Sequence, residues 1–281
     1  KRIKTRKKNL KNIKKNTKNS LKIEKIMGIG FFGRNSRQLL DYLESRENRN
    51  NNKIWIVTVN PEFMVKMKKD PYFKELINRA DLRVMDGIGL VWSRKVLSEK
   101  GFFKKFFKGI EEGVKILKGK GRDRVIAGSD LMNELSKVAA EKNRKVFFLG
   151  GWGDRARLSG ENLKVRYHGL KYDYCEGEPN VNNITVLRKI NEFKPDYLFV
   201  AYGMKKQEEW IVNNLSKLNC KVIIGVGRSF DYYSGALKRA PKLWQNMGLE
   251  WLYSLIQEPK RWRRQLALPQ FIWMVLTNKN N

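Results

Sequence analysis

The sequence is poor in the residues on which many metal sites and nucleophilic enzymes depend. Its 281 residues include two cysteines, Cys175 and Cys220, and a single histidine, His168. Two cysteines exclude a disulfide framework and a multi-cysteine zinc or iron–sulfur site. One histidine excludes histidine-rich metal sites and argues against a Ser-His-Asp triad. No run of about 18 or more apolar residues occurs, so the sequence predicts no transmembrane helix.

Acidic residues are scarce as well. Lys and Arg number 59 against 28 Asp and Glu, which gives a formal net charge of +31. At 41% hydrophobic and 11% aromatic residues, the chain is nevertheless too apolar to be a disordered basic tail. Its length suits one large α/β domain or two modest ones. We therefore expect a folded, reduced and soluble protein with an anionic partner.

The basic charge is concentrated first at the N-terminus, where residues 1–26 contain twelve Lys or Arg and one acid, Glu24. Residues 1–25 are interpreted as a basic extension. It is either a solvated, disordered segment or an electrostatic tether to anionic lipid or nucleic acid. The chain begins at Lys1 rather than Met, which leaves open a preceding targeting segment.

A second basic element lies within residues 98–121, which we interpret as an insertion into the domain. On a helical wheel its apolar side chains fall within an arc of about 140°. They are Phe102, Phe103, Phe106, Phe107, Ile110, Val114 and Leu117. The opposite side holds Lys104, Lys105, Lys108, Glu111, Glu112, Lys115 and Lys118. This pattern is typical of a helix that lies in the plane of a membrane surface, and it also fits a helix whose Phe face packs on its own domain.

The third basic element is the C-terminus, residues 257–281. Basic residues and a tryptophan precede the apolar run 271–276: they are Lys260, Arg261, Trp262, Arg263 and Arg264. The run is too short to span a bilayer, but Trp and Arg beside it suit the headgroup region. We interpret the segment as a helical membrane-binding appendage whose Lys and Arg side chains contact anionic headgroups or a diphosphate. The alternative is a helix that docks on its own domain or on a neighbouring subunit.

Between the basic ends, residues 26–256 alternate short apolar runs with helical periodicity. The pattern predicts strands at 54–58, 82–85, 145–149, 170–175, 196–201 and 221–225. It predicts helices at 35–46, 62–79, 89–97, 129–142, 153–166, 181–193 and 205–217. Near-continuous apolar strands between helices indicate a Rossmann-like parallel sheet sandwiched by helices, as a single α/β catalytic domain.

Five of the six predicted strands end in glycine-rich or polar turns. These turns begin at Thr58, Met85, Leu149, Tyr202 and Gly225. In parallel α/β sheets, ligands bind beyond the carboxyl ends of the strands, and glycine lets backbone N–H groups approach phosphates. The turns therefore suggest a nucleotide-diphosphate ligand. The match of Gly28-Ile-Gly30-Phe-Phe-Gly33 to a dinucleotide-binding motif is not accepted, because no clear strand and no acidic ribose partner accompany it.

At these strand ends the sequence resembles the WecG/TagA/CpsF family of bacterial glycosyltransferases, over about residues 26–268 apart from 98–121. Early blocks are Thr58-x-Asn60-Pro61-Glu62, Asp86-Gly-x-Gly89 and Arg124-Val-x-Ala-Gly128-Ser-Asp130. Later blocks are Lys206-Gln207-Glu208-x-Trp210-Ile211, Gly225-Val-Gly227-x-Ser229-Phe230-Asp231, Lys238-Arg-Ala-Pro241 and Gly248-Leu-Glu-Trp-Leu-Tyr253-x-Leu-Ile-Gln-Glu-Pro259.

The resemblance implies a metal-independent, inverting transfer of an N-acetylhexosamine-type sugar, N-acetylmannosamine or its uronic acid, from a UDP donor. The acceptor would be a sugar on a polyprenyl diphosphate, and the enzyme would be cytoplasmic and peripheral on the inner face of the plasma membrane. Members build linkage units for teichoic acid, enterobacterial common antigen, or capsular and exopolysaccharide. No cofactor or nucleic acid is implied, and a homo-oligomer is left open.

Carried onto this chain, the resemblance makes Asp86 the general base, with Thr58 and Asn60 orienting the acceptor and Arg124 facing the leaving diphosphate. Such a reaction needs one carboxylate to take the acceptor proton and positive groups to stabilise the departing UDP. Without an Asp-x-Asp motif and its ion, Arg and Lys side chains must supply that charge.

Gln207 would line the sugar site, and Asp231 would contact the uracil or ribose. Further substrate-binding candidates are Gly87, Gly89, Gly150, Gly151, Gly203, Lys206, Gly225, Gly227, Arg228 and Arg239. Met204 and Lys205 replace the Ala-Pro common in the family, and Arg228 replaces a glycine, so the identity of the donor is left open. Two other functions are also considered: a basic nucleic-acid-binding module without catalysis, and a degenerate family member that acts as a scaffold.

Overall fold

A six-stranded parallel sheet forms the centre of the protein. The computed structural model describes residues 21–47, 53–177 and 183–279, so most of the expected basic extension 1–25 lies outside the described residues. The strands are β3 (Ile54–Val59), β4 (Leu82–Met85), β5 (Lys145–Gly150), β6 (Lys171–Cys175), β7 (Tyr197–Ala201) and β8 (Val222–Gly225). Their order is β4-β3-β8-β7-β5-β6, and every pair is parallel. The predicted Rossmann-like sheet is confirmed.

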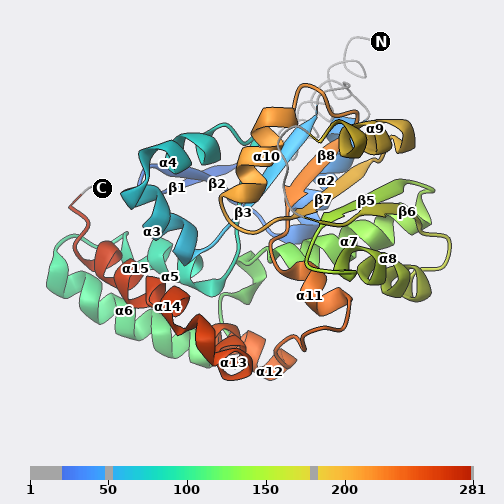
Figure 1. Ribbon diagram of the computed structural model, residues 1–281. Coiled ribbons are helices and arrows are strands. Elements are labelled where there is room, and N and C mark those ends of the chain that lie inside the picture. The colour runs from blue at the N-terminus through green and yellow to red at the C-terminus, as the bar shows by residue number, and fades with distance from the viewer. Residues whose placement is uncertain (1–20, 48–52, 178–182, 280–281) are drawn as a thin grey trace, which may run out of the picture.

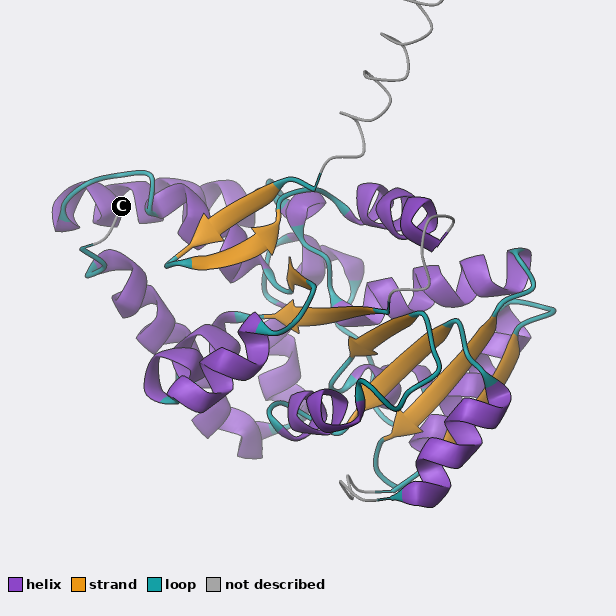
Figure 2. Cartoon of the chain, turned by 90° about the horizontal axis from the view of Figure 1, so that it is seen from above, coloured by secondary structure: helices purple, strands orange, loops and turns teal. Residues whose placement is uncertain are grey.

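Helices cover both faces of the sheet (Figure 1) (Figure 2). Those on one face are α3 (Pro61–Lys69), α4 (Pro71–Asn78), α5 (Ile88–Val96), α9 (Ile184–Phe193), α10 (Lys206–Asn214) and α15 (Ala267–Leu276). Those on the other face are α2 (Ser36–Glu47), α7 (Gly128–Glu141), α8 (Arg155–Arg166) and α11 (Ser229–Tyr233). Strand β5 shows why two cores form, because Phe147 and Leu149 pack into one and Val146 and Phe148 into the other.

The predicted single helix over 62–79 is wrong, because proline divides it. Helix α3 ends at Lys69 and α4 begins at Pro71, where the missing N–H suits a first helical position. Asp70 between them accepts a hydrogen bond from the Phe73 amide and caps the second helix. The break turns α4 away from α3, so that both can cover the sheet.

The glycine motif at residues 28–33 forms a hairpin rather than a nucleotide loop. Strands β1 (Ile23–Ile26) and β2 (Ile29–Phe32) pair antiparallel and are separate from the main sheet (Figure 2). Gly28 sits at the turn with φ of +82°, a conformation that glycine adopts readily. The hairpin is tied to the domain by an ion pair between Glu24 and Arg94.

The C-terminal helices, from residue 242 onward, fold back onto the domain. They comprise α12 (Lys242–Asn246), α13 (Glu250–Gln257), a short turn η2 (Pro259–Arg261), α14 (Trp262–Gln265) and α15. Phe271, Met274 and Val275 of α15 are buried, and α15 packs against α3 and α5. Docking on its own domain is therefore observed, and the predicted membrane contact of residues 257–281 stays a prediction.

Helix α6 (Phe102–Leu117) is the amphipathic helix predicted within residues 98–121, and it packs beside α5 and α15 (Figure 1). Its phenylalanines are exposed rather than packed on the domain. Within the described ranges, no helix is long and apolar enough to cross a membrane.

Candidate active site

A cavity of about 870 Å³ opens at the carboxyl ends of the strands. One side consists of residues at or after the ends of β3, β4, β5, β7 and β8, which we call the sheet-edge wall. The other side, the helical wall, consists of residues from α5, α6 and the segment from α13 to α15. The size is within the range of small-molecule pockets, and the position is where parallel α/β sheets bind ligands.

Many of the residues proposed from the sequence line this cavity. They are Thr58, Asn60, Asp86, Gly87, Gly89, Gly151, Gly203, Gln207, Gly227, Arg228, Asp231, Arg261 and Arg264. These positions are far apart in the chain, and the parallel sheet brings them together because its strands end at one edge. The predicted strand-end turns therefore form one site.

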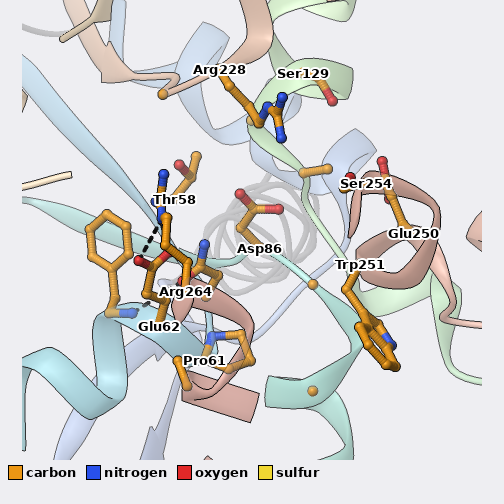
Figure 3. A pocket seen from close by; sticks show the side chains of 18 of the residues that line it. Thr58, Pro61, Glu62, Asp86, Ser129, Arg228, Glu250, Trp251, Ser254 and Arg264 are labelled. Carbon is orange, nitrogen blue, oxygen red and sulfur yellow. Dashed lines mark hydrogen bonds and ion pairs between the residues drawn. The ribbon is translucent and has the colours of Figure 1, made fainter. Parts of the chain in front are cut away.

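Asp86 lies in the middle of the cavity, between Glu62 and Arg264 on one side and Glu250 on the other (Figure 3). It follows β4 directly, and its own amide donates a hydrogen bond to the carbonyl of Val59 at 2.7 Å. Burial is the main cause that raises the pKa of Asp86, from 3.8 to about 7, and the negative charges of Glu250 and Asp130 add to it. A carboxyl with this pKa can accept a proton near neutral pH.

Two glycines after Asp86 give the chain its path. Gly87 has φ of +106°, which side-chain-bearing residues rarely adopt. A Cβ on Gly89 would lie 2.8 Å from Cγ of Pro61, so glycine is needed where α5 approaches α3. Together they allow α5 to begin immediately behind the carboxyl of Asp86.

A network of four charged side chains lies next to Asp86. Arg239 donates hydrogen bonds to Asp130 and, at 3.0 Å, to Glu250, while Arg122 lies 3.6 Å from Glu250. Glu250 and Arg122 line the cavity, and Arg239 and Asp130 stand behind them. The two arginines lower the pKa of Asp86 and the two acids raise it. The network therefore changes the pKa of Asp86 through charge interactions.

Gln207 is held rigidly on the sheet-edge wall. Its Nε2 donates to Oε1 of Glu208 at 2.6 Å, and its Oε1 accepts from the Gly227 amide at 3.2 Å. Glu208 is fully buried and also accepts the backbone N–H of Lys205 at 2.6 Å. A Cβ on Gly225 would lie 2.6 Å from Nε2 of Gln207, so Gly225 supports the site by leaving space rather than by lining it.

Thr58 and Asn60 also have structural partners. The Thr58 hydroxyl donates to the carbonyl of Gly225 at 3.0 Å, which ties β3 to β8 and leaves the oxygen as an acceptor. The Asn60 side-chain oxygen caps α3 by accepting the Phe63 amide at 3.1 Å. A substrate contact from Asn60 would therefore come mainly from its amide nitrogen.

Three arginines line one part of the cavity, and each has an acidic partner: Glu62 pairs with Arg264, and Glu258 pairs with Arg228 and Arg261. Burial followed by the charges of Arg228 and Arg264 lowers the pKa of Arg261. The Nε groups of Arg228 and Arg261 are buried and donate no hydrogen bond to any described residue. Unsatisfied buried cationic donors are costly, and an anionic ligand would satisfy them.

Asp231 adjoins this cluster on the sheet-edge wall. Arg155 binds its Oδ1 at 2.7 Å, and Nε of Arg228 lies 3.5 Å from Oδ2. Burial raises the pKa of Asp231, while Arg155 and Arg228 oppose that rise. Arg155 was not proposed from the sequence, since nothing in its neighbourhood distinguishes it from other surface arginines.

Comparison with known proteins identifies the family of this chain. The profile described as the glycosyl transferase WecG/TagA/CpsF family matches residues 24–106 and 108–281. The chain belongs to this family. The chain is also 30% identical, over 255 residues, to a protein of Staphylococcus aureus strain MRSA252 named N-acetylglucosaminyldiphosphoundecaprenol N-acetyl-beta-D-mannosaminyltransferase. The match covers 90% of this chain and 92% of that protein, and proteins of the same name from strains MW2 and NCTC 8325 match equally.

The WecG/TagA/CpsF match includes most of residues 98–121, which were predicted from the sequence to be an insertion. It also reaches the C-terminus, so α6 and the C-terminal helices both fall within the matched ranges. The resemblance inferred from the strand-end motifs is confirmed.

Some proposed residues lie outside the cavity lining, and Arg124 is the main correction. Its guanidinium donates to the Gly33 carbonyl at 2.7 Å, toward the hairpin. Arg122, two residues earlier, lines the cavity instead. A three-residue 3₁₀ turn, η1 (Arg122–Arg124), separates the two side chains, and the sequence pattern does not show which one faces inward.

The other proposed residues outside the lining are Gly150, Lys206, Gly225, Arg239, Lys260, Trp262 and Arg263. Arg239 is held by Asp130 and Glu250, and Lys206 is exposed at the start of α10. Lys260, Trp262 and Arg263 are exposed on the outer side of the C-terminal segment. Glu62 and Glu250 line the cavity but were not proposed as site residues from the sequence, although both lie inside the family motifs given above.

Proposed function

We propose that this protein transfers an N-acetylmannosamine-type sugar from a UDP donor to N-acetylglucosamine on a polyprenyl diphosphate, with inversion and without a metal ion. The observation that carries the proposal is the carboxyl of Asp86. Its raised pKa and its position between Glu62–Arg264 and Glu250 (Figure 3) support a base in the middle of the cavity. The names of the Staphylococcus aureus relatives support the sugar and the acceptor.

In the proposed reaction, Asp86 takes the proton from the attacking hydroxyl of the acceptor sugar. The hydroxyl oxygen forms the new bond to the anomeric carbon as the bond to the UDP oxygen breaks, so the configuration inverts. A base with a pKa near 7 is partly ionised at neutral pH, which suits general base catalysis. Thr58 and Asn60 lie on the same wall and would orient the acceptor.

The departing UDP carries negative charge that Arg228, Arg261 and Arg264 would stabilise. Their side chains provide fixed positive charge in a partly enclosed site, where electrostatic stabilisation is strong. Asp231, positioned by Arg155, would contact the ribose or uracil, and Gln207 would contact the donor sugar. The arginines would take the role that a divalent ion has in other sugar transfers.

The proposed acceptor is lipid-linked, so we place the enzyme on the cytoplasmic surface of the plasma membrane as a peripheral protein. The net charge of +31 supports attraction to anionic lipid. The donor could carry N-acetylmannosamine or its uronic acid. A screen of UDP-sugars, measuring UDP release with a polyprenyl-diphosphate-N-acetylglucosamine acceptor, separates them.

The decisive variant is Asp86→Asn, which keeps the size of the side chain but cannot accept the proton. We expect its turnover to fall by about 10²–10⁴-fold, while UDP binding by calorimetry stays within threefold (about 0.7 kcal/mol) of wild type. Asp41→Asn, at an exposed carboxylate of α2, is the matched control and should turn over normally. Wild-type turnover by Asp86→Asn would refute the mechanism, and failure of the wild-type protein to bind UDP would favour a scaffold.

A further inference from the structure

Helix α6 presents its apolar side to solvent, the reverse of an ordinary surface helix. Phe103 and Phe107 are 75% and 67% exposed. The other exposed apolar residues of the helix are Phe102, Phe106, Ile110, Val114 and Leu117. A helix in a globular domain normally turns such a stripe inward, because burial of apolar side chains is favourable. Something other than the domain must cover this side.

The polar side of α6 is fixed to the domain, so the helix cannot simply rotate. Lys105 is only 2% exposed, and its Nζ donates to the carbonyl of Asn278. Trp92 of α5 donates from Nε1 to the carbonyl of Gly109 at 2.9 Å. A Cβ on Gly109 would lie 3.0 Å from the Trp92 ring, so the small residue permits this close packing. The outward direction of the phenylalanines is therefore built into the fold.

The C-terminal helix α15 extends the same surface. The Trp273 ring lies 6.1 Å from that of Phe102, edge to face, and Ile272 and Trp273 are both exposed. We call these residues together with the exposed apolar residues of α6 the α6–α15 face. Exposed cations lie within or next to these helices in the chain, namely Lys100, Lys104 and Lys118 for α6 and Arg263 just before α15. Aromatic side chains beside Lys and Arg suit the boundary between lipid headgroups and acyl chains.

The α6–α15 face is continuous with the cavity. Leu117 and Ile272 are exposed and also line the cavity, and Ile116 and Leu268 lie in the helical wall beside them. An apolar path therefore leads from the exposed phenylalanines to the cavity that holds Asp86.

We propose that the α6–α15 face inserts into the surface of an anionic phospholipid bilayer. The lipid chain of the acceptor would then reach the cavity past Leu117 and Ile272 without leaving apolar surroundings. The second step rests on the proposed function, whereas bilayer insertion does not. The neighbouring cations favour an anionic bilayer over a second copy of this chain, since a copy would bring the same positive charges together.

The first experiment measures binding of the full chain to phosphatidylglycerol/phosphatidylethanolamine vesicles by co-sedimentation. We expect the double variant Phe103→Ser/Phe107→Ser to bind about tenfold or more weakly than wild type. The matched control is Val165→Ser/Ile184→Ser, which removes two apolar side chains that are 73% and 78% exposed on α8 and α9. The control should bind like wild type, and wild-type binding by the Phe variant would overturn the proposal.

Two further readouts keep the result interpretable. Because both phenylalanines are exposed, the variant should keep the melting temperature of wild type, and a large drop would show that the face is packed and overturn the proposal. Light scattering reports the oligomeric state. A shift from dimer to monomer in the variant, with vesicle binding unchanged, would assign the face to self-association instead.

The second experiment compares two acceptors. With a long-chain polyprenyl acceptor in vesicles, the Phe variant should lose activity by about the same factor as it loses binding. With a short-chain, water-soluble acceptor its activity should equal that of wild type, because the cavity is unchanged. Equal losses on both acceptors would overturn the lipid path. If wild type used neither acceptor, the proposed function would fail, while vesicle binding would still test the face.

Discussion

The two walls of the cavity differ in how their side chains are held. On the sheet-edge wall, polar groups such as Gln207 and Thr58 are buried and fixed by hydrogen bonds to neighbouring strands. On the helical wall, Glu250 and Arg264 make polar contacts, but beside α6 the wall consists of exposed apolar side chains such as Leu117 and Ile272. The first wall is suited to chemistry that needs fixed geometry, and the second to contact with a fluid apolar phase.

The sheet-edge wall also contains buried carboxyl groups with raised pKa values and a residue with an uncommon backbone conformation. Asp86 and Glu208 both have their pKa raised to about 7, in each case mainly by burial. Lys205, whose amide is held by Glu208, has φ of +77°, an uncommon conformation for a residue with a side chain. Such features persist only where the surrounding structure maintains them, as a packed sheet does. The helical wall lacks that support in its exposed part.

Substitution of Glu208 should cause the largest loss of stability among the residues of the sheet-edge wall. Glu208→Ala leaves the Lys205 amide and Nε2 of Gln207 without their partner and creates a cavity, so we expect a loss of about 3 kcal/mol in unfolding free energy. Denaturant unfolding measures it. The control Glu192→Ala, at an exposed carboxylate of α9, should change stability by less than about 0.5 kcal/mol.

The variant Glu208→Gln tests whether Glu208 positions Gln207, separately from its contribution to stability. It keeps the volume but has one acceptor oxygen where Glu208 has two, so the Lys205 amide and Nε2 of Gln207 compete for that oxygen and Gln207 is held less firmly against the Gly227 amide. We expect KM for the donor to rise about tenfold, equivalent to about 1.4 kcal/mol, with a smaller loss of stability than in the alanine variant. Wild-type KM in Glu208→Gln would show that Glu208 does not position Gln207.

Asp86 should link activity and stability through pH. Its folded pKa of about 7 exceeds the unfolded value of 3.8, so the folded state holds the proton more tightly between these values. Ionisation therefore costs stability as pH rises through that window, while the ionised base needed for catalysis appears. Wild-type kcat/KM should fall about tenfold per pH unit below 7.

Asp86→Asn cannot ionise, so its stability relative to wild type should increase from pH 4 to pH 8, by on the order of 2–4 kcal/mol. Glu208 titrates in the same window in both proteins, and the difference between them isolates Asp86. Urea unfolding at several pH values measures it. A constant difference between the two proteins would mean that the pKa of Asp86 is not raised.

The sequence predicted the sheet well because buried parallel strands are short apolar runs with distinctive ends. The predicted strand at 82–85 coincides with β4, and the turns after five strands all meet at the cavity. Parallel topology makes this possible, because strand ends that are distant in sequence must lie at one edge. The family motifs then added Glu62 and Glu250 without revealing their positions.

The features that the sequence did not predict concern the direction in which side chains face, not the kind of element or residue. The helical wheel of α6 identified the apolar arc, but only tertiary packing at Gly109 and Lys105 determines that the arc faces outward. In the same way, Arg122 and Arg124 are the same residue type, and the short turn η1 directs only Arg122 into the cavity. The pairing of Arg239 with Asp130 and Glu250 joins three separate segments, which no local pattern contains.

The smallest effect we predict concerns the tie between the two walls. Arg264 of α14 donates two hydrogen bonds, at 2.9 and 2.8 Å, to Glu62 of α3, and the pair is visible beside Asp86 in Figure 3. The side chains are 48% and 24% exposed, so solvent screens the interaction. A double-mutant cycle with Glu62→Gln and Arg264→Gln should give a coupling of about 0.2–1 kcal/mol in unfolding free energy.

The ion pair Glu75–Arg79 is the reference for this cycle, because it is more exposed and lies within one helix and its cap. Equal couplings would show that the tie between the walls is no stronger than an ordinary surface pair. The helical wall could then adjust against a bilayer while Asp86 and Gln207 stay fixed in the sheet. A coupling above about 2 kcal/mol for Glu62–Arg264 would instead join the walls into one rigid unit, and the contrast between them would not extend to their motion.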